Sequence, residues 1–225
     1  MQGVRKKGVV CLAICLVAGF VIFANRVAES RRLDAIIDAA NESIEGRDFA
    51  AASAHLNEYL AARPKDIPIR LLAAQTARRN RDFDIARKHL RIYQDLDGPK
   101  EPRARERQLL LAQEDGGAEV VDLLESCLSA TPPEDVDLAC EVAIEQMLNF
   151  LDSSVRAGMS ILEGPRGKAR DRTELAIQLW FQRRPGQADQ VQGLIWRANL
   201  NQWVNLASTH SDYRRALEID PNHFK

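Results

Sequence analysis

A pattern of residues that returns after 34 positions constrains this chain more than any other feature of its sequence. Residues 47–59 carry Arg-Asp-Phe, then Ala, then His-Leu and finally Tyr, and residues 81–93 carry the same residues at the same spacing. On the same offset, the two alanines at 39–40 reappear at 73–74. A period of this length is typical of one helix-turn-helix unit in proteins that stack such units. The repeat therefore predicts a chain built from stacked pairs of helices.

The residues inside the first unit predict how its helices pack. Phe49, Ala52, Leu56 and Tyr59 follow helical spacing and share one face of the unit's second helix. Pro64 would end that helix, because proline cannot continue the hydrogen-bond ladder. We expect the small alanines where two helices cross and the aromatic residues where one unit fills the space against its neighbour. Aromatic residues make up only 6% of the chain, which favours helices over a β architecture.

The first two units share an alanine in the first helix, and an aromatic residue and an alanine that open the second helix; a proline closes the first and third units. These residues are Ala40, Phe49, Ala52 and Pro64 in the first unit, Ala74, Phe83 and Ala86 in the second, and Pro132 in the third. The arrangement resembles the tetratricopeptide repeat family, and the ending Ala-Leu-Glu-Ile-Asp-Pro-Asn at 216–222 resembles the end of that family's second helix. The resemblance is strong at 33–100 and at the end of the chain, fair at 101–134, and weak at 135–188.

The resemblance implies an all-α fold, a right-handed α-solenoid of stacked helix-turn-helix repeats, which we expect to follow one N-terminal transmembrane helix. In the weak region, helices are readable at 136–151, 154–162 and 172–182. The predicted boundaries are a basic segment at 1–7, an anchor at 8–24, a linker at 25–32, and repeat units at 33–66, 67–100 and 101–134, a degenerate stretch at 135–188 and a last unit at 189–225.

An uncharged apolar run at residues 8–24 follows three basic residues at 5–7. Its 17 residues reach the lower limit for a membrane-spanning helix, roughly 17–25 residues. A cleaved signal peptide is the alternative, with Ile22 and Ala24 at a tolerable cleavage site. We expect an uncleaved, single-pass anchor that leaves the N-terminus in the cytoplasm and the repeats in the periplasm. Arginines after the run make this orientation uncertain from charge alone.

The resemblance also implies a concave groove, lined by positions on the first helix of each unit. Carried onto this chain, the partner-binding residues are Asn41, Glu45, Leu71, Gln75, Arg78 and Arg79. Arg78 and Arg79 would donate charge-assisted hydrogen bonds to a carboxylate or to backbone carbonyls of another protein or a peptide segment. The alternative is that all six are solvated helix residues. The carboxylate clamp of the chaperone-tail binders is not expected, because only Asn41 fits it.

Other patterns give little reason to expect catalysis, a cofactor or a metal. The net charge of −1 does not favour nucleic acid as a partner. His55 and His89 lie one repeat apart, but no third ligand is fixed beside them. Residues 164–168 have the wrong spacing for a phosphate-binding loop, so we expect an ordinary basic loop there. No nucleophile motif or paired-carboxylate arrangement stands in a defined context.

Cysteines and tryptophans leave two alternatives open. Cys127 and Cys140 fall on predicted helices, where an isolated cysteine is most often a small buried residue, although a disulfide is possible in an oxidising compartment. Trp180, Trp196 and Trp203 lie at helical spacing and are expected in the core; an exposed docking face is the alternative.

The sequence thus predicts a membrane-anchored, non-enzymatic scaffold for protein–protein interaction, by analogy with repeat proteins of envelope assembly or export. Two other hypotheses stay open at this point. The chain could be the regulatory or targeting part of a larger enzyme whose catalytic domain lies beyond residue 225, or it could be a self-associating structural protein.

Overall fold

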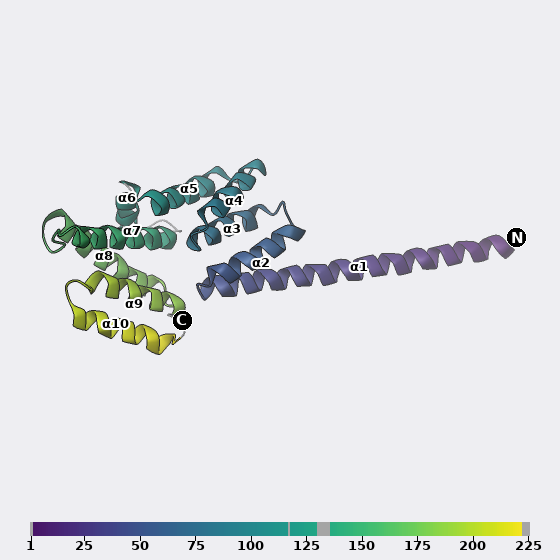
Figure 1. The fold of residues 1–225 in the computed structure, drawn as a ribbon. Helices are drawn as coiled ribbons and strands as arrows, with labels where there is room; N and C mark the ends of the chain where they lie inside the picture. The colour runs from purple at the N-terminus through teal and green to yellow at the C-terminus, as the bar shows by residue number, and fades with distance from the viewer. Residues whose placement is uncertain (1, 117, 130–135, 222–225) are drawn as a thin grey trace.

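The computed structural model of the chain is all-helical over the residues that it describes, which are 2–116, 118–129 and 136–221 (Figure 1). At 2–22, 24, 115, 118 and 119 the description covers the backbone only. These ranges hold ten helices and no strand: α1 (Gln2–Glu45), α2 (Phe49–Ala62), α3 (Ile67–Arg79), α4 (Phe83–Asp95), α5 (Lys100–Asp115), α6 (Ala118–Leu128), α7 (Val136–Arg156), α8 (Gly164–Arg183), α9 (Gln187–Asn201) and α10 (Leu206–Ile219). The prediction of an all-α chain is confirmed.

The repeated Arg-Asp-Phe residues form the same turn twice. Arg47 and Arg81 both have left-handed backbone angles, with φ of 61° and 64°. After each arginine, the amide of the aspartate donates to a carbonyl of the preceding helix, from Asp48 to Ser43 and from Asp82 to Ala77, at 2.8 Å in both cases. This bond closes the helix end in the Schellman arrangement. The repeat therefore encodes a fixed reversal of the chain between α1 and α2 and between α3 and α4.

The alanines of the repeat lie where paired helices cross. Ala40, Ala52, Ala74 and Ala86 are all fully buried, and α1 packs against α2 as α3 packs against α4. A larger side chain at these positions would push the two backbones apart. The short residues predicted at the crossings are confirmed.

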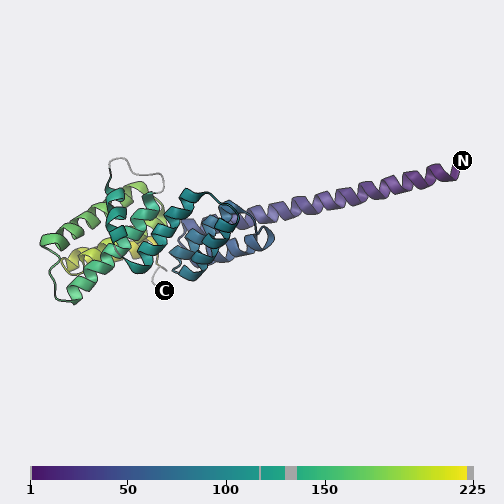
Figure 2. The ribbon, with the colours of Figure 1, turned by 90° about the horizontal axis from the view of Figure 1, so that it is seen from above.

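The middle of the chain packs differently from the two ends. Although α5 and α6 follow one another, α6 packs mainly against α7 and α8, where its buried Leu124 and Cys127 join a core that includes Ile144 and Trp180. Figures 1 and 2 show α6, α7 and α8 grouped together, with the hairpin of α9 and α10 beside them. Helix α9 packs on α7 and α8 and adds Trp196 to this core. Most of the core's described residues lie in the region where the family resemblance is weak.

Two expectations for residues 135–188 are corrected by the structure. The helices predicted at 136–151 and 154–162 are one helix and a loop, because α7 continues to Arg156 before Gly158 reverses the chain with φ of 75°. The basic loop predicted at 164–168 is the first turn of α8. Pro165 suits that turn, because the first amides of a helix have no partner inside it.

The expected transmembrane helix and single-pass membrane location are contradicted. Among the described residues, no helix is long and apolar enough to cross a membrane. The uncharged run is part of the 44-residue helix α1, and its 17 residues would span about 26 Å, less than the roughly 30 Å of a bilayer core. The side chains of residues 8–22 and 24, on which the expected anchor depended, lie outside the description.

The two histidines of the repeat occupy different environments. His55 is half-buried on α2, whereas His89 on α4 is only 5% exposed, and Arg70 Nη1 lies 3.2 Å from its Nδ1. A guanidinium can only donate, so this contact requires an unprotonated Nδ1. Burial and the adjacent Arg70 cation lower the pKa of His89 to about 4.

Stability should therefore fall in acid because of His89. Between pH 6.5 and 4 the unfolded chain binds a proton at this histidine and the folded chain does not, so stability present above pH 6.5 is lost as the pH falls towards 4. We expect this acid-induced loss of stability to be about 2 kcal/mol smaller in a His89→Gln variant than in the original chain. The amide oxygen of the glutamine can still accept a hydrogen bond from Arg70. Urea unfolding at pH 7.5, 5.5 and 4.5 measures this, with His55→Gln as the matched control. An unchanged pH dependence in His89→Gln would contradict the assignment.

Candidate binding site between the first and fourth helix pairs

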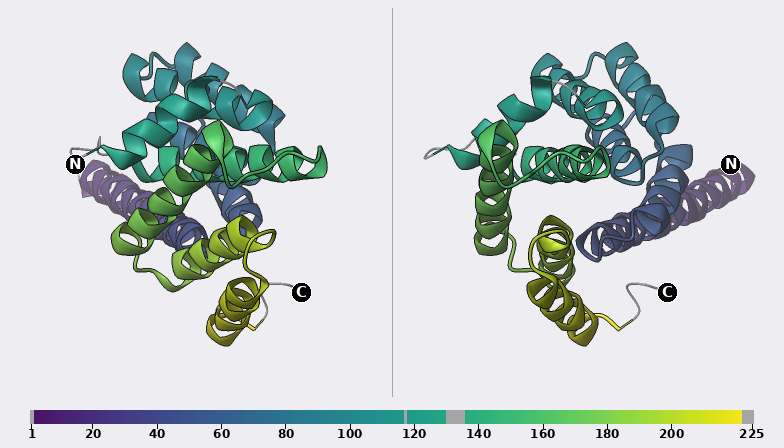
Figure 3. Two further views of the ribbon diagram at one scale, coloured as in Figure 1. Left: turned by 90° about the vertical axis from the view of Figure 1, so that its left-hand side faces the viewer. Right: turned by 60° about the vertical axis from the view of Figure 1, so that its left-hand side comes forward.

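Arg47 connects the first turn of the repeat to helices far along the chain. Its Nη2 donates to Glu141 Oε1 on α7 at 2.7 Å, and its Nη1 donates to Asp189 Oδ1 on α9 at 3.2 Å. Only 8% of the Arg47 side chain is exposed. In Figure 3 the helices follow one another around a ring, so that the α1–α2 turn comes to face α9. Arg47 closes this ring by joining the α1–α2 turn to α7 and α9 through buried ion pairs.

Glu141 binds a second arginine with its other oxygen. Arg79 Nη2 at the end of α3 lies 3.0 Å from Glu141 Oε2, and the Arg79 guanidinium stacks 4.1 Å from the centre of the Phe49 ring. Burial alone would raise the pKa of the Glu141 carboxyl, but the guanidinium groups of Arg79 and Arg47 outweigh it and hold the pKa below its ordinary value. Glu141 is therefore a permanent anion between two cations.

Aromatic rings enclose the Arg47 guanidinium. It lies 5.8 Å from the ring of Trp180 and 5.9 Å from that of Trp196, and the two indoles meet edge to face at 4.9 Å. The Trp180 Nε1 donates to the Asp189 backbone carbonyl at 2.9 Å. A cation over the face of an indole is attracted by the ring quadrupole, most strongly where water is excluded. Trp180 and Trp196 are buried as predicted, whereas Trp203 is half exposed.

A cavity of about 210 Å³ opens beside this ion network. Four helices supply its walls, namely α1, α3, α7 and α8; the lining residues are Ile44, Leu72, Gln75, Thr76, Arg79, Asp137, Leu138, Glu141, Trp180 and Arg184. Arg184 and Asp137 are each about one-third exposed and lie 3.7 Å apart. The walls thus offer charges of both signs, an amide and an indole. These groups suit one polar residue of a bound peptide, including part of that residue's backbone.

The structure separates the six residues predicted to line a groove. Gln75 and Arg79 line the cavity. Leu71 packs into the core between α3 and α4, and Asn41 and Glu45 lie exposed on α1.

Arg78 is 1% exposed and is committed to internal partners. Its Nε donates to Glu106 Oε1 at 2.6 Å, and its Nη1 donates to Gln113 Oε1 at 3.0 Å. Successive residues point about 100° apart around a helix, which is why Arg78 and Arg79 reach different partners. Arg78 therefore holds α5 against α3 and is absent from the cavity.

Sequence reasoning missed the cavity residues contributed by α7 and α8. Asp137, Glu141, Trp180 and Arg184 lie in the region that lacks the landmarks of the repeat. One signal was present for Glu141, which is the single charged residue in the run Leu-Ala-Cys-Glu-Val-Ala-Ile at 138–144. A lone carboxylate on such an apolar helix is almost always paired when buried.

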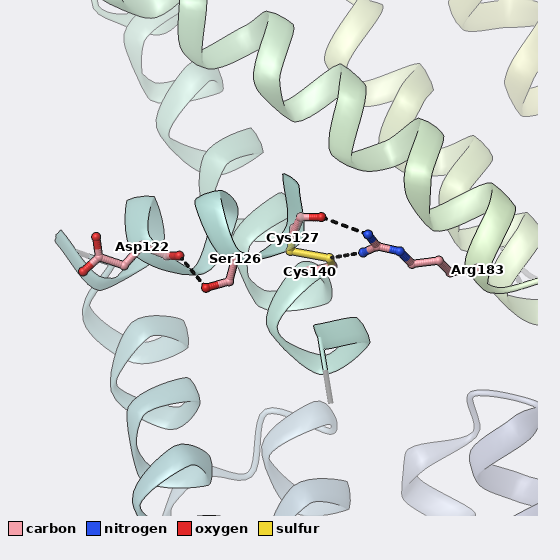
Figure 4. Close-up of a disulfide and its surroundings, with 5 residues drawn as sticks. All are labelled: Asp122, Ser126, Cys127, Cys140 and Arg183. Atoms are coloured by element: carbon pink, nitrogen blue, oxygen red, sulfur yellow. Dashed lines mark hydrogen bonds between the residues drawn. A yellow bond between two sulfur atoms is a disulfide. The ribbon is translucent and has the colours of Figure 1, made fainter. Parts of the chain in front are cut away.

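A disulfide joins α6 to α7 next to this region. Cys127 and Cys140 are bonded, with their Cα atoms 5.4 Å apart. Figure 4 shows Arg183 of α8 approaching the same point, where its Nη2 donates to the Cys127 carbonyl at 3.1 Å and its Nη1 lies 3.7 Å from Cys140 Sγ. The alternative that the sequence left open for these cysteines is thus decided in favour of a covalent link between α6 and α7.

Comparison of the chain with models of protein families, with curated proteins and with solved structures gave no match. Statements about function therefore depend on the residues and contacts described above.

Proposed function

We propose that this chain is a tetratricopeptide-like α-solenoid that acts as a non-enzymatic scaffold and binds a segment of another protein. The observation that carries the proposal is the cavity between α3 and α7, whose walls combine hydrogen-bonding groups with an indole. Aromatic residues and arginines are the side chains that most often dominate protein-binding sites. The 34-residue repeat supports the same conclusion, because arrays of such units commonly present surfaces for partners.

The charges beside the cavity favour binding over catalysis. A general base must accept a proton at the working pH, and its pKa is best near that pH. Glu141 has a pKa below its ordinary value and both its oxygens hold arginines, so it is a poor base. The paired charges of Glu141 and Arg79 instead form one wall of the cavity. The uncharged amide of Gln75 lies in the same lining, where it can form hydrogen bonds with a peptide backbone.

A peptide-display selection tests this function. A library of random peptides is selected on the immobilised chain, and enriched peptides are measured by titration against two variants. Gln75→Trp fills the cavity with an indole, and Gln108→Trp places the same indole on an exposed position of α5 that lines no described cavity. We expect the enriched peptides to lose at least about tenfold in affinity on Gln75→Trp, about 1.4 kcal/mol, and to bind Gln108→Trp as they bind the original chain.

The selection can also contradict the proposal. Enriched peptides that bind Gln75→Trp unchanged would remove the cavity from consideration, and a selection that enriches no peptide would remove the scaffold function. A mass that rises with concentration in light scattering would favour the self-associating alternative. The hypothesis that the chain is part of a larger enzyme stays a prediction.

A further inference from the structure

A second cleft, between α4 and α5, carries an unusual concentration of positive charge. It has a volume of about 310 Å³ and lies outside the ion network that closes the ring. Four of its lining residues are arginines, at 87, 91, 103 and 107, and one is a glutamate, at 114, which gives the lining a net charge of 4 − 1 = +3. The whole chain has a net charge of −1, so the excess is local.

Among the described residues, one of the four arginines, Arg87, is neutralised by its neighbours. Arg87 Nη1 lies 2.6 Å from Glu114, and Arg87 Nη2 lies 2.7 Å from Asp84. In the part of the chain that the structure describes, Arg91, Arg103 and Arg107 form no ion pair. Three cationic side chains therefore face the cleft with their hydrogen-bonding capacity free.

The spacing of these arginines is unfavourable for the isolated helices. Arg87 and Arg91 are four residues apart on α4, and Arg103 and Arg107 are four residues apart on α5. Like charges at this spacing repel and cost a helix a few tenths of a kcal/mol per pair, roughly 0.2–0.5. Arg87 gains its pairs with Asp84 and Glu114 in return. Among the described residues Arg91, Arg103 and Arg107 gain no such pair, whereas an anionic partner lying between the two rows would be attracted by all three.

The floor of the cleft is apolar. Leu90 and Leu110 are buried beneath the arginines, and Leu111 is nearly half exposed at its edge. A free phosphate would use the charges and leave the leucines unused. Proteins that bind single-stranded nucleic acid usually stack its bases on aromatic side chains, and the lining has none. A segment that carries carboxylates beside an aliphatic side chain would use both parts of the cleft.

We propose that the cleft between α4 and α5 binds an acidic, leucine-containing segment of a partner protein. Its carboxylates accept hydrogen bonds from Arg91, Arg103 and Arg107, which can bind them bidentately. Its aliphatic side chain packs against Leu111, the exposed leucine of the lining. The inference rests on the proposed scaffold function but uses a surface separate from the cavity beside Arg79.

The probe is a fluorescently labelled peptide of about 12 residues, at most about 40 Å long when extended, in which glutamates flank the leucines. Binding is measured by fluorescence anisotropy on the full chain. We expect the Arg91→Glu/Arg107→Glu variant to bind it about 10–100-fold more weakly. Arg214→Glu/Arg215→Glu, which makes the same charge change at exposed positions of α10, should bind it unchanged. Binding should also weaken as salt is raised.

Three controls separate the possible outcomes. A peptide with every glutamate replaced by glutamine should not bind; equal binding would overturn the proposal. A single-stranded oligonucleotide of equal charge should bind more weakly than the acidic peptide, and tighter binding would overturn it in favour of nucleic acid. Gln75→Trp should leave acidic-peptide binding intact, so that failure of the cavity and failure of this cleft are seen separately. Circular dichroism of both double variants confirms that they are folded.

Discussion

Replacing Glu141 with glutamine is expected to lower the free energy of unfolding by about 3–5 kcal/mol, the usual cost of leaving a buried charge unpaired. Glu141 holds Arg47 with one oxygen and Arg79 with the other. Asp189 can still partner Arg47, but within the described residues Arg79 has no other carboxylate, and its Nε already lacks a hydrogen-bond partner. The variant leaves a buried guanidinium without an anion. Urea unfolding at pH 7 followed by circular dichroism measures the loss.

Glu145→Gln is the matched control, because it makes the same chemical change one turn further along α7. Burial, with a contribution from the Glu141 charge, raises the pKa of Glu145 to about 6. At pH 7 the ionised Glu145 carboxylate therefore lowers the free energy of unfolding, and removing its charge should leave that free energy unchanged or raise it slightly. Small-angle scattering should show an expanded particle for Glu141→Gln alone, since this variant removes the ion pair that links the α1–α2 turn to α7 and leaves Arg47 the longer contact with Asp189 on α9. Equal unfolding midpoints for both variants would show that Glu141 does not close the ring.

The sequence predicted the parts of the fold that depend on neighbouring residues. The repeat placed Phe49 and Tyr59 on one helix, which is α2, and placed Ala40 and Ala86 at helix crossings, because a pair of helices and its turn lie within one 34-residue unit.

Contacts between distant units were beyond the reach of that pattern. Arg47 and Asp189 are 142 residues apart, and whether they meet depends on the summed rotation of all the helix pairs between them. A repeat in sequence specifies how each unit packs on the next, but it does not specify which distant units come into contact. Its landmarks were also absent from α7 and α8, so the residues that complete the cavity were not predicted. Arg78 and Arg79 were both assigned to the groove from the family resemblance, although their directions around α3 differ.

The buried pair between Arg78 and Glu106 provides the second large effect. The Arg78 Nε to Glu106 Oε1 distance is 2.6 Å, and both side chains are at most 2% exposed. Glu106→Leu alone is expected to cost about 3–5 kcal/mol, because it strands a buried cation. Arg78→Met with Glu106→Leu removes both charges and keeps the volume, so it should cost only about 1 kcal/mol, from the lost hydrogen bond to Gln113. Urea unfolding of the single and double variants measures the difference.

An exposed ion pair supplies the control for this comparison. Arg156 and Asp152 lie 2.7 Å apart on α7, with 74% of the arginine side chain exposed. Asp152→Asn should cost no more than about 0.5 kcal/mol, because water solvates the arginine that remains. The contrast isolates burial as the cause, since both pairs have similar distances and the same chemistry. The double variant at Arg78 and Glu106 could instead unfold as easily as Glu106→Leu alone. That result would mean that α3 and α5 require the ion pair itself, and it would contradict the explanation by an uncompensated charge.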